Sequence, residues 1–397
     1  MIKRELESSL KRLQKTMPVL AVIGPRQSGK TTLIREVFPD YEYFNLEKQE
    51  DIDLISKNPE NFFKNHSRNV ILDEVQKMPE LLSRIMITVD ETRALGSFVI
   101  SGSENLLLSE KISQSLAGRV GYVTLLPTSL KERSLDLDDD YFSDSIMDNL
   151  FKGGYPAVYQ NNVIPSEYYS NYISTYIERD VRQVLNIKDL VSFRKLLVLL
   201  ANSVGSEVNY ATLSKQVGIS TKTIQNWLSI LEATYIIFRL QPYFDNFGKR
   251  IVKSPKIFFY DTGILLYLLG YSMDDLGRDT TLYGHVFENL VITEVIKNLT
   301  NLNIQPDVYF FKASSQDEVD LIIGHGFRQT LIEIKSANIV NRNFFKGLNY
   351  YQAVAAAKHD VSRQFLIYNG QRENVSGRQL LNWQEIDEVT DYYDSQN

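Results

Sequence analysis

The eight residues GPRQSGKT at 24–31 restrict the fold of this chain more than any other stretch of it. They match the pattern G-x-x-x-x-G-K-[ST], in which a glycine-rich loop turns its backbone N–H groups towards a phosphate. The context fits the pattern, because the apolar segment 19–23 precedes the loop and the helical pattern 31–38 follows it. The sequence therefore predicts a phosphate-binding loop between a buried strand and the positively polarised N-terminus of a helix.

Within this loop, Lys30 is the expected catalytic cation, since its ammonium group can reach the β- and γ-phosphates of a nucleotide. The Thr31 hydroxyl is expected to bind the Mg²⁺ that accompanies ATP. The loop residues expected to contact ATP are Gly24, Pro25, Arg26, Gln27, Ser28, Gly29, Lys30, Thr31 and Thr32.

The segment 70-VILDEVQ-76 reads as a buried strand that ends in two carboxylates. Asp73 is expected to hold Mg²⁺, directly or through water, and Glu74 to polarise the attacking water. Solvated carboxylates at an ordinary strand end are the alternative. The neighbouring phosphate loop disfavours that alternative, and the presence of both acids favours hydrolysis over passive nucleotide binding.

Two further residues are candidates for contact with the γ-phosphate. Ser103 follows the predicted strand 97–102, where it could sense the phosphate or instead cap a turn. Arg119 could reach the γ-phosphate of a neighbouring subunit, or it could be an ordinary surface arginine. Arg179 and Arg182 are weaker candidates for the same role.

Strands alternate with helical patterns over 19–126, which predicts a parallel, doubly wound sheet of the α/β class. The tract 132–148 holds seven acidic residues and one basic residue, as expected of a solvated loop. Residues 209–236 predict a helix-turn-helix, and the strand pair after it predicts a wing. The domains expected are an ATPase core at 1–131, an acidic loop and helical linker at 132–203, a winged helix at 204–265 and a nuclease-like domain at 280–397.

The C-terminal region carries a second group of chemically active side chains. In strand 330–335 the two-residue period places Glu333 and Lys335 on one face, and Asp320 projects from the strand beside it. A helix can add Glu288. Three carboxylates form an oxygen-rich site that suits Mg²⁺ or Mn²⁺, which would activate water. The alternative is the polar outer face of an amphipathic sheet.

These motifs together resemble the bacterial and archaeal AAA-superfamily ATPases fused to a C-terminal domain similar to PD-(D/E)XK nucleases. The matching segments, in the family's order, are GPRQSGKT, VILDEVQ, FVISGSEN, SLAGR, GGYP, YIERDV, FYDTGI, GHVFEN, EVDLII and IEIKSA. The resemblance implies a RecA-like P-loop core, a helical and winged-helix middle and a restriction-endonuclease-like end.

The resemblance also implies roles for individual side chains. For ATP, it implies that Lys30 and Thr31 bind phosphate and that Asp73 and Glu74 act on the metal ion and the attacking water. Those implied for the nuclease-like end are metal binding by Asp320 and Glu333, a catalytic role for Lys335 and a supporting acid role for Glu288.

Charge leaves room for a DNA-binding face. The net charge is −6, but it comes mostly from the 132–148 tract and from 383–397, which has five acidic residues and no basic one. Residues 205–260 hold seven basic and three acidic residues, as suits phosphate contacts. The expected DNA contacts are Lys222, Thr223, Gln225 and Asn226 on the second helix and Lys249 and Arg250 on the wing. Use of the winged helix for protein contact is the alternative.

The chain has no cysteine, which excludes disulfides, thiolate zinc sites and cysteine catalysis. Its charged N-terminus is unlike a signal peptide, and its apolar runs are too short to span a membrane, so we expect a cytoplasmic protein. The function expected is an Mg²⁺-dependent ATPase that forms a homo-oligomer, such as a hexamer-like ring, and processes DNA, branched DNA included. The alternatives are a nucleotide-driven regulatory or defence switch and a DNA-binding scaffold with an inactive nuclease fold.

Overall fold

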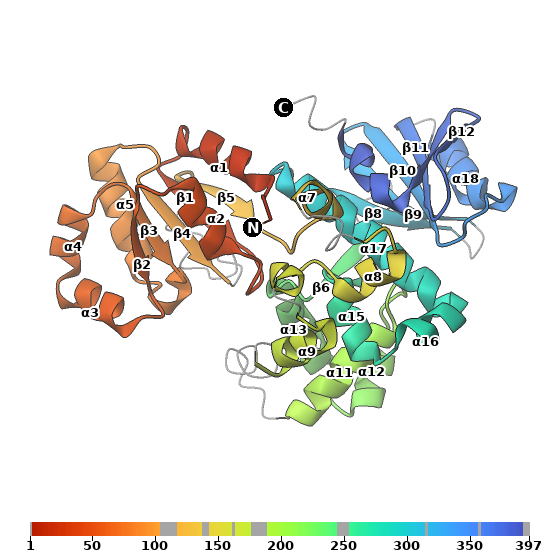
Figure 1. Cartoon of the computed structure of the whole chain (residues 1–397), viewed down its shortest axis with the longest axis horizontal. Helices are drawn as coiled ribbons and strands as arrows, with labels where there is room; N and C mark the ends of the chain where they lie inside the picture. Colours follow the sequence, from red (N-terminus) through yellow and green to blue (C-terminus); the bar gives the residue numbers. More distant parts are fainter. Residues whose placement is uncertain are drawn as a thin grey trace. The chain divides into compact units, whose positions relative to one another are not determined.

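The structure is a computed structural model that describes residues 2–103, 117–136, 143–160, 163–175, 189–243, 254–313, 317–355 and 359–391 (Figure 1). The chain divides into two compact units. Unit 1 comprises Met1–Thr128, Ala233–Tyr235 and Thr300–Ile304, and unit 2 comprises Ser129–Glu232, Ile236–Leu299 and Gln305–Asn397. None of the helices in these described ranges has both the length and the hydropathy that a bilayer-spanning helix needs.

Unit 1 is built on a five-stranded sheet in the order β2-β3-β4-β1-β5, with every pair parallel. The strands are β1 Val19–Ile23, β2 Glu42–Asn45, β3 Val70–Asp73, β4 Phe98–Gly102 and β5 Val120–Thr124. The three central strands β3, β4 and β1 are buried along their whole length, because helices cover both faces of the sheet. The predicted parallel α/β sheet is confirmed.

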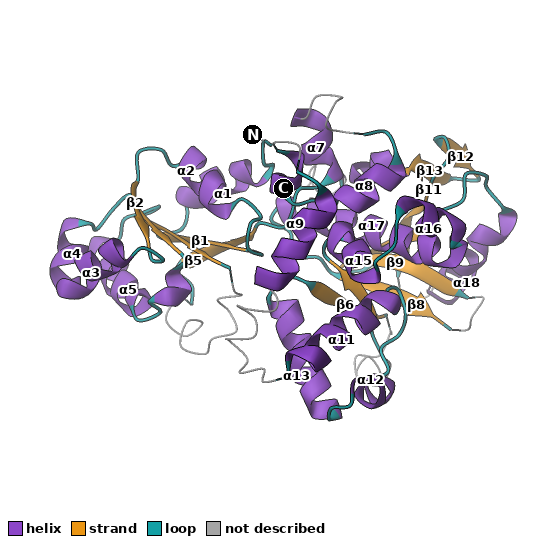
Figure 2. Ribbon diagram, turned by 60° about the horizontal axis from the view of Figure 1, so that its bottom comes forward, coloured by secondary structure: helices purple, strands orange, loops and turns teal. Residues whose placement is uncertain are grey.

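The side chains of β1 alternate between two cores. Leu20 and Val22 pack against helices α1 (Leu6–Gln14) and α2 (Lys30–Val37). Val19, Ala21 and Ile23 pack on the other face. The helices that cover that face are α3 Gln49–Lys57, α4 Pro59–Asn65 and α5 Leu81–Thr92 (Figure 2). The loop after β1 and the residues after β3 and β4 therefore meet at the carboxyl edge of one sheet, where such folds bind ligands.

Unit 2 begins with helices and short turns. Its elements up to residue 301 are α7 Leu130–Asp136, α8 Ile146–Lys152, η3 Pro156–Tyr159, α9 Pro165–Tyr172, α11 Leu190–Asn202, α12 Tyr210–Val217, α13 Thr221–Ala233, β6 Ile237–Pro242, β7 Lys256–Phe259, α15 Thr262–Leu269, α16 Met273–Arg278 and α17 Thr280–Asn301. Gly218, with φ +88°, ends α12, and the Ser220 hydroxyl accepts a hydrogen bond from the Thr223 N–H at the start of α13.

The start of the acidic tract differs from the sequence prediction. Residues 132–136 belong to α7, and the Arg133 side chain is buried, donating to the Gly153 carbonyl and the Tyr159 hydroxyl. Glu294 of α17 lies 4.0 Å from the Arg133 guanidinium and supplies a buried countercharge. The expectation of a solvated loop is therefore wrong for Glu132 and Arg133, which are buried in unit 2, whereas Ser134 and Leu135 of the same helix are exposed.

The second sheet has eight strands in the order β12-β13-β11-β10-β9-β8-β6-β7. Its C-terminal strands are β8 Val308–Lys312, β9 Glu318–His325, β10 Arg328–Lys335, β11 Asp360–Tyr368, β12 Glu373–Val375 and β13 Arg378–Asn382. The remaining elements are η5 Arg342–Phe345, α18 Lys346–Ala355 and η6 Trp383–Val389. Hairpin β6–β7 joins these strands through the pairs Gln241–Tyr309 and Pro242–Phe310. The hairpin and the C-terminal strands are therefore one continuous sheet.

Candidate functional site

The phosphate-binding loop follows an unusual backbone path between β1 and α2. Three of its residues have positive φ angles: Gly24 (+148°), Gln27 (+60°) and Gly29 (+95°). A Cβ atom on Gly24 would lie 2.2 Å from the backbone oxygen of Leu125, so only glycine fits there. The Ser28 hydroxyl is buried and donates to the Pro25 carbonyl (Oγ–O 3.0 Å). The loop is thus a tight turn whose conformation depends on glycine at position 24 and on the buried Ser28 hydroxyl.

The Lys30 side chain folds back over this loop and is buried. Its Nζ atom donates to the carbonyl oxygens of Gly24 (3.0 Å) and Pro25 (2.8 Å). Burial lowers the pKa of Lys30 to about 8, an effect that the charges of Glu74 and Asp73 only partly oppose. A phosphate would offer this ammonium group a charged acceptor in place of two neutral carbonyls.

Arg4 supports the loop from outside its own sequence, and the sequence analysis missed it. Its guanidinium is buried, and Nη1 donates to the Ser28 carbonyl (2.8 Å) while Nη2 donates to the Leu126 carbonyl (2.7 Å). Arg4 therefore ties the phosphate loop to the segment after β5. Nothing in the residues around Arg4 signals this role, because both of its acceptors lie far along the chain.

The expected magnesium ligands of the nucleotide site lie together. The Thr31 hydroxyl donates to Asp73 Oδ2 (2.7 Å), and the Tyr43 hydroxyl donates to the same oxygen (2.7 Å). Ser101 donates to the other oxygen of Asp73. A hydroxyl and a carboxylate side by side are the protein ligands that Mg²⁺ uses beside nucleotide phosphates, so Thr31 and Asp73 fit the ion. Tyr43 and Ser101 hold Asp73 in place and were not predicted.

Glu74 stands next to this pair in a left-handed conformation, with φ +60°. Gln76 donates to Glu74 Oε2 and also to the Ser103 hydroxyl (Nε2–Oγ 3.0 Å), and that hydroxyl lies 3.3 Å from Glu74 Oε2. Ser103 and Gln76 therefore orient the carboxylate that we expected to polarise water. Gln76 was missed, although its position two residues after Glu74 could have indicated it.

Three further residues were expected at the nucleotide, namely Arg26, Thr32 and Arg119. Arg26 pairs with Glu47 (3.2 Å), and Thr32 is exposed. Arg119 pairs with Asp90 (Nε–Oδ1 2.7 Å), and its carbonyl accepts from the N–H of Val19, the first residue of β1. The phosphate loop follows the last residue of β1, so Arg119 and Lys30 lie at opposite ends of that strand. A phosphate contact by Arg119 stays a prediction and would require another subunit. Arg179 and Arg182 lie outside the described residues.

The second predicted site forms a group that we call the carboxylate cluster: Glu288, Glu318, Asp320, Glu333, Lys256 and Lys335. Lys335 Nζ lies 3.2 Å from Asp320 Oδ2 and 2.6 Å from Glu333 Oε1. Asp320 also accepts from the Ile334 N–H (2.8 Å). The structure thus brings together Asp320, Glu333 and Lys335 as the strand period predicted.

Burial and the neighbouring Asp320 raise the pKa of Glu333 to about 9, against the opposing charge of Lys335. Burial also raises the pKa of Asp320. The second carboxylate oxygen of Glu333 is buried and has no hydrogen-bond partner in the described part of the chain. Asp320 and Glu333 therefore fit a hard cation that would supply the missing partner.

Glu288 fits this metal set less well. Its Oε1 atom lies 2.9 Å from the Nζ atom of Lys256, a buried lysine that the sequence analysis did not consider. Burial acts to raise the pKa of Glu288, but the charges of Lys256 and His285 outweigh it and lower that pKa. Across the described ranges, no three His, Asp or Glu side chains are grouped so as to hold one metal ion. The metal role of these carboxylates stays a prediction.

The expected DNA contacts can be placed on α13 alone. Lys222, Gln225 and Asn226 are exposed and Thr223 is half-buried, whereas Lys249 and Arg250 lie outside the described residues. Two of the seven basic residues of 205–260 are engaged inside unit 2. Arg239 pairs with Glu232, and Lys256 lies in the carboxylate cluster. The exposed positive charge of this region is therefore smaller than its composition suggests.

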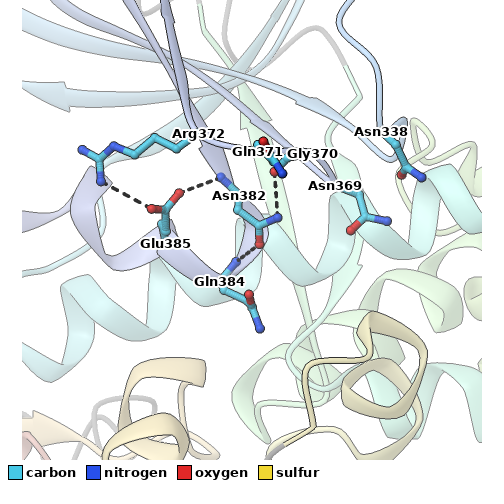
Figure 3. A pocket seen from close by; sticks show the side chains of 8 residues that line it. All are labelled: Asn338, Asn369, Gly370, Gln371, Arg372, Asn382, Gln384 and Glu385. Carbon is cyan, nitrogen blue, oxygen red and sulfur yellow. Dashed lines mark hydrogen bonds and ion pairs between the residues drawn. The ribbon is translucent and has the colours of Figure 1, made fainter.

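A polar pocket of about 560 Å³ opens at the carboxyl ends of strands β10, β11 and β13 (Figure 3). Asn382 donates to the Gly370 carbonyl (2.8 Å), and Glu385 accepts from the Asn382 N–H (2.9 Å). The residues lining it are Asn338, Asn369, Gly370, Gln371, Arg372, Asn382, Gln384 and Glu385. Asn338 follows Lys335 by three residues, so the pocket begins where the strand of the predicted catalytic lysine ends. No sequence pattern indicated it.

Comparison with known proteins assigns the N-terminal part. Residues 16–134 match the sequence model of a family described as an AAA domain. This match supports a P-loop ATPase of the AAA type in this part of the chain, and with it ATP binding and ATP hydrolysis. Residues 143–275 and 283–386 match two families described as domains of unknown function, DUF8612 and DUF4143.

Relatives extend over most of the chain. An uncharacterized protein of Mycobacterium tuberculosis is 27% identical over 98% of this chain and 86% of the relative. An uncharacterized protein of Methanocaldococcus jannaschii is 24% identical over 80% of this chain and 74% of the relative. Among solved structures, a Walker-type ATPase of Pyrococcus abyssi is 15% identical over 68% of this chain and 96% of that chain, with a TM-score of 0.45.

Proposed function

We propose that this chain is an Mg²⁺-dependent ATP hydrolase that acts on DNA as an oligomer, and that its C-terminal sheet carries a nuclease-like site. The single observation that carries the ATPase proposal is the contact between Thr31 and Asp73 (2.7 Å) beside the buried ammonium group of Lys30. The residues that we propose for binding phosphate, metal and water lie there together, at one edge of a sheet.

In the proposed reaction, Lys30 leaves the carbonyls of Gly24 and Pro25 and binds the β- and γ-phosphates. Thr31 and Asp73 would hold Mg²⁺, which neutralises phosphate charge when bound. Glu74 orients the attacking water and accepts its proton, while Gln76 and Ser103 fix the carboxylate. Positioning and charge stabilisation are the main contributions that proteins make to phosphoryl transfer.

The ATPase test is the turnover of Lys30→Ala and Glu74→Gln. We expect each to lower the ATPase rate by about 100-fold or more, with Glu74→Gln still binding ATP. The matched controls are Lys57→Ala and Glu60→Gln, which change exposed residues of unit 1 and should retain full turnover. Wild-type rates in both site variants would refute the proposal.

DNA binding is supported by the exposed polar start of α13, which follows α12 and a short turn as in helix-turn-helix proteins. We expect the triple variant Lys222→Ala, Gln225→Ala, Asn226→Ala to bind duplex DNA roughly 10-fold more weakly and with a smaller salt dependence. Fluorescence anisotropy at several salt concentrations measures both quantities. Lys195→Ala, an exposed cation on α11, is the control. Equal affinity of the triple variant and wild type would argue for protein contact instead.

Nuclease activity is supported by the meeting of Asp320, Glu333 and Lys335. The test is cleavage of linear, single-stranded and junction DNA in Mg²⁺ or Mn²⁺, with ATPase rate and assembly size measured in parallel. Cleavage that persists in Asp320→Ala plus Lys335→Ala would refute the assignment.

A nucleotide-driven regulatory or defence switch is the second candidate, in which the C-terminal sheet only binds DNA or a partner. The observation that favours it is the pairing of Lys256 with Glu288, which removes one carboxylate from the predicted metal set. ATP-dependent assembly without DNA cleavage and without stimulation by DNA would favour this switch over the first proposal.

A further inference from the structure

Lys256, the first residue of β7, lies in the carboxylate cluster as a second buried cation. Its Nζ atom is 2.9 Å from Glu288 Oε1 on α17 and 2.7 Å from Glu318 Oε1 on β9. The ammonium group also lies 5.3 Å from the centre of the Phe310 ring on β8. The residue is only 4% exposed. A lysine is rarely buried this deeply unless its charge is paired, and here two carboxylates pair with it.

The backbone on both sides fixes the position of Lys256. On one side, β6 pairs with β7 so that Leu240 lies opposite Lys256. On the other side, the Gly205 N–H donates to the Ile257 carbonyl (2.9 Å) and the Val208 N–H donates to the Pro255 carbonyl (2.8 Å). The backbone of Lys256 is therefore held between strand β6 and the segment 205–208.

This arrangement divides the cluster into two pairs of acids. Lys335 contacts Asp320 and Glu333, whereas Lys256 contacts Glu288 and Glu318. A divalent cation at either pair would lie close to an ammonium group, since Lys335 Nζ is 2.6 Å from Glu333 Oε1 and Lys256 Nζ is 2.9 Å from Glu288 Oε1. The two glutamates differ in their second oxygen. In Glu333 it is buried and has no hydrogen-bond partner in the described part of the chain, whereas in Glu288 it lies 3.7 Å from His285 Nδ1.

We propose that Lys256 is a positioning residue that holds Glu288 and Glu318 as its own counter-ions, so that a metal ion at this site is bound by Asp320 and Glu333 without Glu288. The inference rests on the nuclease-like site of the proposed function, but it concerns metal binding and requires neither DNA cleavage nor ATP turnover. It also makes hairpin β6–β7 a structural part of that site.

The test is Mn²⁺ binding to the full-length chain without nucleotide, measured by electron paramagnetic resonance of the free ion and by calorimetry. Lys256→Met removes the ammonium group that pairs with Glu288 and Glu318, and with it one positive charge, so we expect Mn²⁺ to bind at least 10-fold more tightly. Lys256→Arg should keep the wild-type affinity. Adding Asp320→Asn to Lys256→Met should abolish the gain, which identifies the cluster as the site measured.

Lys312→Met is the matched control for charge. Lys312 contacts the same Glu318 at 3.6 Å but lies at the rim, with its side chain 36% exposed. Its loss removes one positive charge without freeing Glu288, so we expect less than a 3-fold change. Thermal unfolding monitors whether each variant is folded, and Lys256→Gln replaces Lys256→Met if the latter fails to fold.

Glu288→Gln in the wild-type background provides an independent test, since it leaves Lys256 in place. We expect unchanged Mn²⁺ affinity, because Glu288 is a counter-ion rather than a ligand. Weaker Mn²⁺ binding by Glu288→Gln would overturn the proposal. Unchanged affinity in folded Lys256→Met or Lys256→Gln would overturn it as well. Loss of DNA cleavage or of ATPase activity in any variant would bear on the proposed function and leave this inference intact.

Discussion

Lys30 in the phosphate-binding loop and Lys256 in the carboxylate cluster are both buried ammonium groups, yet they have opposite kinds of partner. Lys30 is held by two backbone carbonyls, and burial lowers its pKa to about 8. Burial acts in the same direction on Lys256, but the charges of Glu288, Asp320 and Glu318 outweigh it and raise that pKa. Binding an anion would stabilise the charged form of Lys30, whereas Lys256 is already paired with carboxylates. We therefore expect unit 1 to respond strongly to a phosphate ligand, and Glu288 and Glu318, already paired with Lys256, to resist new cations.

The largest effect is expected from Gly24→Ala in the loop. The added Cβ atom would lie 2.2 Å from the Leu125 oxygen at a φ of +148°. Backbone strain alone costs about 1–3 kcal/mol, and the collision adds to it, so ATP affinity should fall roughly 100-fold. Gly118→Ala is the control, since Gly118 has φ +74° but no atom near its Cβ position. Calorimetric titration with ATP decides, and equal affinity in both variants would mean that the loop is not rigid.

Arg4→Gln tests whether the loop depends on support from outside its own sequence. Two charged hydrogen bonds to buried carbonyls are lost, which should destabilise unit 1 by about 2–4 kcal/mol and weaken ATP binding by about 10-fold. Denaturant unfolding and ATP titration measure the two effects. Arg12→Gln changes an exposed arginine of α1 and should alter neither. A stable Arg4→Gln variant with normal ATP affinity would contradict the role of Arg4.

The lowered pKa of Lys30 predicts a pH dependence of ATP binding. Bound phosphate should raise this pKa, so the complex binds a proton that the free protein loses above about pH 8. Affinity should then fall by up to about 10-fold between pH 8 and pH 9, with proton uptake on binding. Calorimetry in buffers of different ionisation enthalpy measures the uptake. Lys30→Met should show none, and a wild-type protein without uptake would refute the prediction.

The carboxylate cluster should show a pH dependence of stability. Glu333 keeps its proton to about pH 9 in the folded chain but loses it near pH 4.5 when unfolded, so stability falls as pH rises through that window. Glu333→Gln keeps an acceptor for Lys335 and removes the titration. The difference in unfolding free energy between Glu333→Gln and the wild type should therefore grow in favour of the variant, from near zero at pH 5 to roughly 1–3 kcal/mol at pH 8. A gain independent of pH, in denaturant unfolding, would argue against the raised pKa.

The smallest effect is expected from Gly205→Ala beside the cluster. Its Cβ atom would lie 2.9 Å from His285 Nδ1 and 3.1 Å from Glu288 Oε2, at a φ of +71°. We expect a loss of about 1–2 kcal/mol in stability, because the flexible His285 ring can move aside. Gly218→Ala has a similar φ of +88° but open space around the Cβ position, so it isolates the strain. Equal losses of stability in Gly205→Ala and Gly218→Ala, measured by thermal unfolding, would show that the close approach to Glu288 adds no destabilisation.

The sequence predicted what is local and missed what is distant. The phosphate loop was predictable because all of its turns lie within one contiguous segment, residues 24–31. Arg4 joins that loop through carbonyls 24 and 122 residues away, and no periodicity encodes such a contact. Asp320, Glu333 and Lys335 were predicted because β9 and β10 are sequence neighbours that pair. Lys256 was not, because its place depends on β6 pairing with β8 across the intervening helices.

Strand prediction followed the same rule. The five strands of unit 1 all contain buried apolar residues and lie within 19–126, where the sequence predicted alternating strands and helices. Strands β12 and β13 were missed, because they are short and lack a clear apolar alternation. Strand β13 nevertheless helps to line the polar pocket, since its last residue is Asn382. Features that depend on such short elements require the structure.

The continuity of the eight-stranded sheet has a consequence for how this chain can be divided. One family match ends at residue 275 and the next begins at residue 283. Strand β6, in the first match, nevertheless pairs with strand β8, in the second. A fragment cut between them would leave β8 as a bare sheet edge, with unpaired N–H and C=O groups that invite aggregation. Recombination at that point would separate Lys256 from Glu288 in the same step. The two segments are therefore expected to be inherited together.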